Sequence, residues 1–304
     1  MNKRRAISQG GRQHQRLLRK LTPSKFAHQK YLCQVAEFTD QCSSLFLDLE
    51  EAHEYVPISE LNVIRSELFG REYLVAYVDS DWLGSLAPYC DAVATPELNM
   101  GRFLSPPMVL APETKSRSKG VIFRSTLEHE FVHVNQAILG RFPELNGIKN
   151  RPFQCFLEHV QAEYEANFLQ LFRWPKLYSK AKAQGLSLEE WCVLRGYTQA
   201  LEKVVAAVLD GKLSKIQVER LLKECQKKLP SGLQQLGLDR KTASEFANRL
   251  PPYLAQAVTM FANGGPAGST QGREGILALT AWISLNLPLS KTTGSLGMTE
   301  NSGD

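Results

Sequence analysis

The spacing of apolar residues changes along the first half of the chain, and the change predicts helices followed by a small sheet. Between residues 23 and 49 apolar residues recur at roughly helical spacing, which predicts one or two helices. Short runs rich in β-branched and aromatic residues follow, bounded by prolines. Within residues 70–112 they predict a small sheet with strands at 73–78, 92–95 and 108–111. We expect the last strand to lie at an edge of the sheet, because prolines flank it.

The second half of the chain has an almost wholly helical pattern. Ser125 and Glu128 have the spacing of a capping box, which predicts that a helix begins near Thr126. Proline and glycine separate this helix from further ones. The expected helices cover residues 126–140, 155–173, 188–209, 214–228, 240–250 and 253–262. The predicted fold class is therefore α+β and mostly α.

The composition is that of a folded protein with an ordinary core. With 43 % hydrophobic and 22 % charged residues, the chain falls outside the disordered, collagen-like and membrane classes. Its six cysteines form no C-x-x-C pair, so neither a zinc ribbon nor a dense disulfide framework is expected. The first twenty residues lack the apolar stretch of a secretory signal, and no segment has the length and hydropathy of a membrane span. We therefore expect a cytoplasmic protein without a membrane partner.

The positive charge is concentrated at the start of the chain. The net charge is +5, yet residues 1–20 carry seven lysines or arginines and no acidic residue. A basic arm can contact nucleic acid, but no aromatic residue interleaves with these charges, so a nucleic-acid partner is not favoured. Residues 1–22 are interpreted as a disordered basic tail, and residues 290–304 as a second disordered tail. The glycine-rich segment 263–275 lacks the lysine of a phosphate-binding loop and is interpreted as a linker.

One short segment carries a motif with specific chemistry. Residues His129 to His133 read H-E-F-V-H, which is the H-E-x-x-H pattern of zinc sites. On a helix the two histidines lie one turn apart on the same face, so both imidazoles can bind one Zn²⁺ ion. Glu130 is then placed to take a proton from water bound to the metal. The expected helix also has an apolar stripe that would bury it, formed by Leu127, Phe131, Val134 and Ile138.

A catalytic zinc site requires a third protein ligand and leaves a fourth position for water. The metzincin class is excluded, because Leu139 stands where its third histidine would be and Gln136 where its glycine would be. No aspartate occurs between His133 and Asp210, which leaves a glutamate of the next helix. Three glutamates are available there: Glu158, Glu163 and Glu165.

Glu163 is the preferred ligand among the three. Its helical stripe also carries His159 and Asn167, and small alanines flank it, so another helix and a metal ion can approach closely. Glu158 and Glu165 share a stripe of more solvated composition. These two glutamates are the alternatives.

The two segments together resemble a family of zinc peptidases. H-E-F-V-H, followed thirty residues later by Glu163-Tyr-Glu-Ala-Asn167, is similar to the gluzincin pattern of ImmA/IrrE-like and HtpX-like peptidases over about fifty residues. The resemblance implies a zinc-dependent metallopeptidase that hydrolyses a peptide or protein substrate. It also implies that His129, His133 and Glu163 bind Zn²⁺, that Glu130 is the general base, and that Asn167 orients a ligand.

The expected organisation has four parts. A zincin-like metallopeptidase core occupies residues 23–180 and a helical C-terminal subdomain residues 181–289, between disordered tails at 1–22 and 290–304. The strand at 108–111 would pair with an extended substrate. The alternative to a peptidase is a catalytically inactive zincin-like module with a regulatory or binding role.

Two questions about the chemistry stay open in the sequence. Hydrolysis requires a group that stabilises the oxyanion, and the candidates are Tyr164, Tyr178, His159, Arg173 and Tyr197. A cysteine hydrolase that uses Cys155 and His159 is weakly supported, since both residues lie on one expected helix without a glycine elbow.

Overall fold

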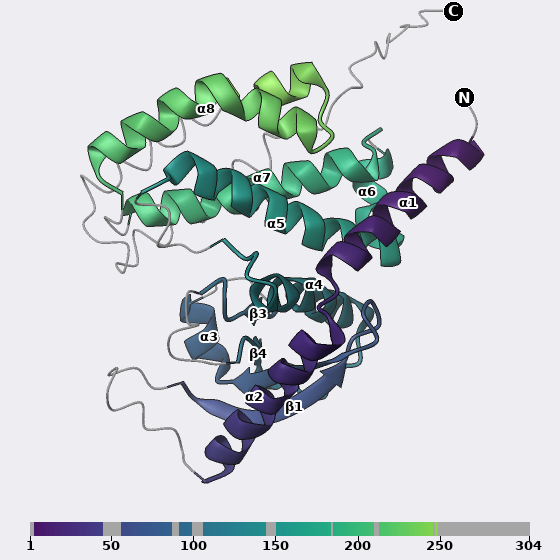
Figure 1. Cartoon of the computed structure of the whole chain (residues 1–304), viewed down its shortest axis with the longest axis vertical. Helices are drawn as coiled ribbons and strands as arrows, with labels where there is room; N and C mark the ends of the chain where they lie inside the picture. Colours follow the sequence, from purple (N-terminus) through teal and green to yellow (C-terminus); the bar gives the residue numbers. More distant parts are fainter. Residues whose placement is uncertain are drawn as a thin grey trace, which may run out of the picture.

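Helices and one small sheet make up the part of the chain that the structure, a computed structural model, describes (Figure 1). The described residues are 3–44, 56–86, 91–98, 106–143, 150–183, 185–209, 213–245 and 247–248. Most of them are helical, so the α+β fold class, mostly α, is confirmed. None of the described helices is long and apolar enough to cross a membrane.

The sheet has four strands in the order β1-β2-β4-β3. These strands are β1 (Ile58–Arg65), β2 (Glu72–Val78), β3 (Val93–Ala94) and β4 (Val109–Pro112). β1 and β2 form an antiparallel hairpin, β4 runs parallel to β2, and β3 is antiparallel to β4. β2, β3 and β4 coincide with the three predicted strands.

Two strands differ from the expectation. β1 has no counterpart among the predicted elements, because its polar and apolar residues do not alternate regularly: Ser59 and Glu60 are both polar, and Val63 and Ile64 are both apolar. The strand is only partly buried at the edge of the sheet. The expectation that residues 108–111 form an edge strand is wrong. β4 lies between β2 and β3, and Val109, Leu110 and Ala111 are fully buried. The flanking prolines mark the ends of the strand, and the edge on this side of the sheet is β3.

The helix that carries the H-E-x-x-H motif, α4 (Val121–Ile138), begins earlier than the expected start near Thr126. The predicted capping box is wrong, because Ser125 Oγ donates a hydrogen bond to a carbonyl of the same helix. Glu128 instead accepts a hydrogen bond from Ser66 Oγ (2.6 Å), in the turn between β1 and β2. Glu128 thus joins the first turns of α4 to the hairpin.

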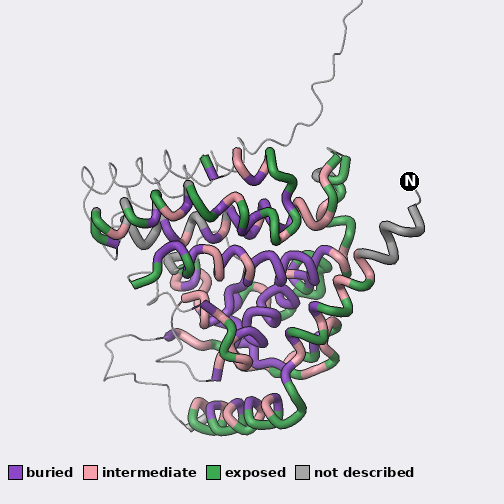
Figure 2. The backbone as a smooth tube through the Cα atoms, turned by 45° about the horizontal axis from the view of Figure 1, so that its top comes forward, coloured by how far each residue is buried: buried purple, intermediate pink, exposed green. Residues whose placement is uncertain are grey.

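α4 lies between two apolar cores, in the buried middle of the molecule (Figure 2). On one side Leu127, Phe131 and Val134 pack against β2 and β4. On the other side Val132 packs among the helices of the second half of the chain. The predicted apolar stripe is therefore confirmed, with Ile138 partly buried at its end.

The helices of the second half lie on the side of α4 away from the sheet (Figure 1). They are α5 (Pro152–Arg173), α6 (Ser179–Ala183), α7 (Leu188–Leu209) and α8 (Lys215–Gln235). α7 has its predicted bounds, and α8 continues beyond its predicted end at residue 228. Short elements among the described residues include α3 (Ser80–Leu86) and 3₁₀ turns at Glu113–Lys115 and Pro175–Tyr178. Residues 240–245 and 247–248, within the helix predicted at 240–250, are also helical.

α5 and α7 approach each other closely at Gly196. A Cβ atom at this glycine would lie 2.8 Å from the carbonyl oxygen of Val160 and 3.0 Å from the backbone nitrogen of Tyr164. Any other residue would therefore force the two backbones apart. This close approach brings the part of α7 that follows Gly196, including Lys203, beside the middle of α5.

The expectation of a disordered tail over residues 1–22 is wrong for the described part of that segment. Residues Lys3–Leu21 form α1, which leads into α2 (Lys25–Ser44). Leu17 and Leu21 are buried in the core that they share with α5, α7 and α8, which we call the helical layer. Lys20 forms an ion pair with Glu165 of α5. Apolar residues are few in this segment, and the buried ones lie near its end, so the basic residues dominated the interpretation of the sequence.

Several expected features lie outside the described residues. They are the helix at 253–262, the glycine-rich segment 263–275 and the tail at 290–304. The domain boundaries near residues 180 and 289 stay predictions.

We expect Leu21→Ala to lower the free energy of unfolding by roughly 2–5 kcal/mol, because Leu21 is fully buried and the substitution leaves a cavity. Arg19→Ala, at an exposed position of the same helix, should change it by less than about 0.5 kcal/mol. Chemical denaturation of both variants measures the difference. Equal stability of the two variants would mean that α1 does not dock on the helical layer.

Candidate metal centre

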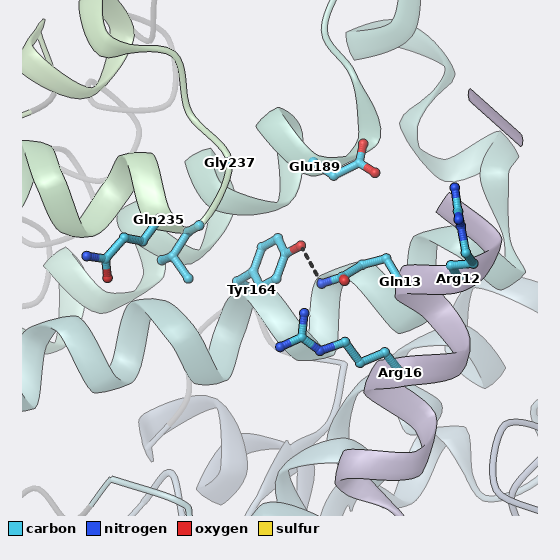
Figure 3. A pocket seen from close by; sticks show the side chains of 8 residues that line it. Arg12, Gln13, Arg16, Tyr164, Glu189, Gln235 and Gly237 are labelled. Atoms are coloured by element: carbon cyan, nitrogen blue, oxygen red, sulfur yellow. Dashed lines mark hydrogen bonds between the residues drawn. The ribbon is translucent and has the colours of Figure 1, made fainter. Parts of the chain in front are cut away.

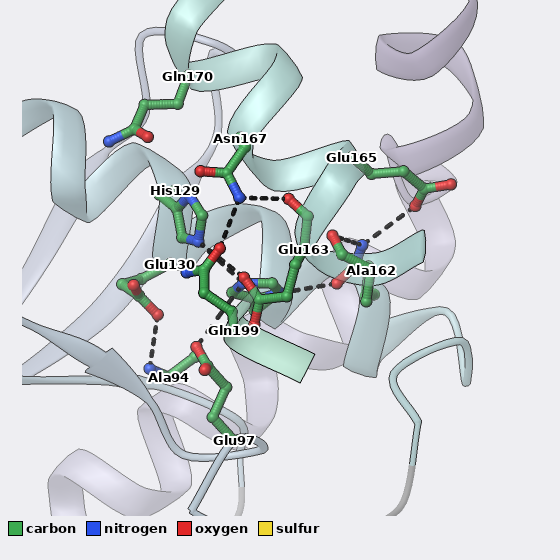
Figure 4. A network of polar contacts seen from close by, with 12 residues as sticks. Ala94, Glu97, His129, Glu130, Ala162, Glu163, Glu165, Asn167, Gln170 and Gln199 are labelled. Atoms are coloured by element: carbon green, nitrogen blue, oxygen red, sulfur yellow. Dashed lines mark hydrogen bonds and ion pairs between the residues drawn. The ribbon is translucent and has the colours of Figure 1, made fainter. Parts of the chain in front are cut away.

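Three side chains of the kind that bind metals meet between α4 and α5 (Figure 4). His129 and His133 lie one turn apart on α4, and their Nε2 atoms are 3.2 Å apart. Glu163 of α5 places its Oε2 atom 3.4 Å from Nε2 of His129 and 3.5 Å from Nε2 of His133. All three side chains are buried. The structure therefore brings together the two histidines and the preferred glutamate.

The separations among these three atoms fit a tetrahedral zinc ion. Zinc bonds to nitrogen and oxygen are about 2.0–2.2 Å long, so two ligands at the tetrahedral angle lie about 3.3–3.6 Å apart. The Oε2 atom of Glu163 is also buried and accepts no hydrogen bond from any described residue. Burying a carboxylate oxygen without a partner is costly, and a cation between this oxygen and the imidazoles would remove that cost.

The other two candidate glutamates of α5 point elsewhere. Glu165 is buried on another side of the helix, where it pairs with Lys20 and accepts a hydrogen bond from Gln136 (3.1 Å). Glu158 is more exposed, and its carboxylate accepts a hydrogen bond from Gln154 (3.0 Å). Glu163 is therefore the glutamate that reaches the histidines.

Glu130, the residue between the histidines in the motif, lies at the edge of the sheet. Its Oε2 atom accepts a hydrogen bond from the backbone N–H of Ala94 in β3 (2.8 Å). Burial, together with the carboxylate of Glu97 beside it, raises the pKa of Glu130 well above its ordinary value.

Glu97 and Lys203 belong to this cluster and were missed in the sequence. Glu97 follows β3, and its Oε1 atom lies 3.7 Å from Nε2 of His133. Lys203 lies on α7, with Nζ 3.0 Å from Oε2 of Glu97 and 3.4 Å from Oε1 of Glu163. Neither residue belongs to a motif. The one sequence feature that could have indicated Lys203 is its position as a charged residue beside the apolar stripe of the helix predicted at 188–209.

Glu97 and Lys203 keep opposite charges although both are largely withdrawn from water. Burial opposes the ionisation of Glu97, but the Lys203 ammonium and His133 lower its pKa to about 2. Burial likewise opposes the charge on Lys203, but the carboxylates of Glu97 and Glu163 raise its pKa above the ordinary value. The two side chains therefore form an ion pair between the turn after β3 and α7.

A hydrogen bond fixes which nitrogen of His133 faces the cluster. Nδ1 of His133 lies 2.8 Å from Oε1 of Gln136. The amide nitrogen of Gln136 donates to Glu165 and to the carbonyl of Ala162 (both 3.1 Å), so its oxygen faces the imidazole. Nδ1 therefore carries a proton, and Nε2 is the ring nitrogen that faces Glu163 and could bind a metal.

The described hydrogen bonds of Asn167 go to the backbone of α5 and to α7. Its amide nitrogen donates to the backbone carbonyl of Glu163 and to Oε1 of Gln199 on α7 (both 2.8 Å). It thus joins α5 to α7, and no contact with the carboxylate of Glu163 is among its described hydrogen bonds.

The five candidates for oxyanion stabilisation are scattered. The hydroxyl of Tyr164 accepts a hydrogen bond from Gln13 of α1, and Arg173 pairs with Glu67 (3.3 Å). Tyr197 packs against Phe156, and Tyr178 lies against the helical core. His159 is buried beside Phe142, and no described residue hydrogen-bonds its ring nitrogens.

The cysteine-hydrolase reading receives no support from the structure. Cys155 is buried, and burial raises the pKa of its thiol to about 11. Burial lowers the pKa of His159 to about 3. A thiol of this kind stays protonated near neutral pH and is a poor nucleophile.

No family model, curated protein or solved structure matches this chain.

Two cavities open near α5. The first, of about 730 Å³, lies beside His133 and Glu163 and is lined by Gln136, Phe142 and Ala162. Basic and acidic residues also line it. The second, of about 610 Å³, lies between α1, the start of α7 and the end of α8 (Figure 3). The hydroxyl of Tyr164 points into it, beside Arg16.

Gln136→Ala should lower the affinity for Zn²⁺ by about 10–100-fold, because the partner that orients His133 is lost while the three ligands remain. Gln154→Ala is the matched control, since Gln154 bonds Glu158 at the surface. Titration against a competing chelator measures both affinities. Equal affinities for the two variants would show that Gln136 does not orient His133 for metal binding.

Proposed function

We propose that this chain is a zinc-dependent metallopeptidase with a zincin-like core, and that His129, His133 and Glu163 are its zinc ligands. The observation that carries the proposal is the buried Oε2 atom of Glu163, to which no described residue donates a hydrogen bond. This oxygen lies 3.4 Å from Nε2 of His129 and 3.5 Å from Nε2 of His133, separations that suit a shared metal ion. The sequence resemblance to gluzincins supports the same ligands. The substrate class is a peptide or protein.

The residues around the ligands support hydrolysis by water. A bound zinc ion lowers the pKa of water toward neutrality and polarises a carbonyl group. Glu130 takes the proton of the attacking water and returns it to the leaving amine. The hydrogen bond from Ala94 keeps the carboxylate of Glu130 at the edge of the sheet, beside the ligands.

The edge strand β3 supports an extended substrate beside this site. β3 pairs with β4 on one side, and its other side faces Glu130. A peptide in extended conformation could add to such an edge through backbone hydrogen bonds. In this proposal β3 replaces residues 108–111 as the strand that pairs with substrate, and the peptide takes the place of Glu130 as acceptor of the Ala94 N–H.

Purified protein should contain one zinc ion per chain, and the double variant His129→Ala/His133→Ala should contain none. Among the glutamates of α5, Glu163→Ala should lose the ion, whereas Glu165→Ala and Glu158→Ala should retain it, because their carboxylates point away from the histidines. Elemental analysis and chelator titration measure both effects. Equal zinc content in the wild type and the double variant would contradict the metal site.

Glu130→Gln should retain zinc and lower the rate of peptide hydrolysis by about 10²–10⁴-fold, because it removes the proton acceptor and keeps all three ligands. Glu113→Gln, in the exposed 3₁₀ turn after β4, is the matched control and should leave the rate unchanged. The rates are measured on a peptide that the wild type cleaves. Full activity of Glu130→Gln would place the base at another residue.

A separate observation favours the alternative of an inactive binding module. The two histidines and Glu163 are almost fully buried, and Glu130 is already bonded to the backbone of β3. Bound zinc without hydrolysis of any member of a peptide library would support this alternative.

A further inference from the structure

Lys203 lies in the candidate metal centre but comes from α7, outside the two segments that carry the zinc motif. Its ammonium contacts Glu97 at 3.0 Å and Glu163 at 3.4 Å. Nζ also lies 5.6 Å from the centre of the Phe142 ring, which packs edge-on against His133. The position of this cation is therefore fixed from several sides.

Two carboxylates each connect Lys203 to the histidines. Glu163 directs Oε1 toward Lys203 and Oε2 toward both imidazoles. Glu97 directs Oε2 toward Lys203 and Oε1 toward Nε2 of His133. In each of these two carboxylates, one oxygen therefore contacts the ammonium and the other faces the imidazole nitrogens.

Lys203 and Glu97 form the more exposed side of this cluster. The side chains of Lys203 and Glu97 are 18 % and 15 % exposed, whereas those of His129, His133 and Glu163 are 8 %, 0 % and 2 % exposed. A substrate that reaches the histidines from this side passes the ammonium. An ammonium has three N–H donors, and the two carboxylates account for two of them.

We propose that Lys203 is a catalytic residue that donates a hydrogen bond to the carbonyl oxygen of the scissile peptide as this oxygen becomes negatively charged. This role rests on the proposed peptidase function. It supplies the oxyanion-stabilising group for which the sequence offered only scattered candidates. Glu97 is then a positioning residue, because its carboxylate holds the ammonium toward the ligands.

The bonds and charges of the step balance without any further reactant. Water adds to the carbonyl carbon, its proton goes to Glu130, and the electron pair of the C=O bond moves onto the oxygen. Lys203 keeps all its protons and stabilises that oxygen by charge and hydrogen bonding. The C=O bond then re-forms, the C–N bond breaks, and Glu130 gives its proton to the leaving amine.

Three variants of the zinc-loaded full chain test this role. Lys203→Met removes the charge at similar length, Lys203→Arg keeps a charge but moves the donors, and Lys241→Met is the control at a lysine whose side chain is 86 % exposed. The measurements are zinc content, kcat and KM on a cleaved peptide, and the affinity for a phosphonate peptide, whose anionic tetrahedral group resembles the transition state.

Lys203→Met should keep one zinc ion per chain and lower kcat by about 10²–10³-fold, with a much smaller change in KM. The affinity for the phosphonate peptide should fall by a similar factor, and Lys203→Arg should recover part of both losses. Lys241→Met should behave as the wild type.

Other outcomes would overturn the role. Unchanged kcat and phosphonate affinity in Lys203→Met, beside an active wild type, would overturn the role of Lys203 alone. If Lys203→Met does not fold or hold zinc, wild-type kcat and phosphonate affinity in Lys203→Arg would show that the lysine only balances charge. A wild type that binds no zinc or cleaves no peptide would overturn the proposed function, and the role of Lys203 with it.

Discussion

The centre of the structure depends on one buried carboxylate, that of Glu163. An ionised carboxylate loses several kcal/mol of hydration when it is buried, and this loss has to be offset by partners on all sides. Lys203 offsets it at one oxygen, and the imidazoles of His129 and His133 face the other. Burial opposes the ionisation of Glu163, but His133, Lys203 and His129 together hold its pKa well below the ordinary value. Three helices therefore have to keep their relative positions for this group to stay charged.

Packing around α5 satisfies that constraint. Gly196 allows α7 to contact the backbone of α5, and the hydrogen bonds of Asn167 join the two helices one turn beyond Glu163. On the opposite side, the amide of Gln136 joins α4 to α5. These contacts bring Lys203 close to Glu163, although no sequence motif links the two residues. A substitution that enlarges residue 196 would therefore act on the centre through the spacing of the helices.

The centre also couples the sheet to the helical layer. α4 is held to the β1–β2 turn by Glu128 and to β2 by the hydrogen bond from the Tyr73 hydroxyl to Asn135 (2.9 Å). Glu97 and Ala94 come from the segment around β3, whereas Lys203 comes from α7, in the expected C-terminal subdomain. Residues assigned by sequence to two different parts therefore share one buried network, in which neither part supplies all the charges.

The sequence by itself determined the local features. Helical periodicity alone predicts that His129 and His133 share one face of a helix and that Leu127, Phe131 and Val134 form its buried stripe. The preference for Glu163 also rested on helical spacing, which places it on one face of the next helix with His159 and Asn167. Tertiary structure decided the rest. The docking of α1, the interior position of β4 and the contacts of Glu128 depend on partners distant in the chain. The same holds for Glu97 and Lys203, because a charge pair formed between a turn and a helix far apart in sequence leaves no periodic pattern in either segment.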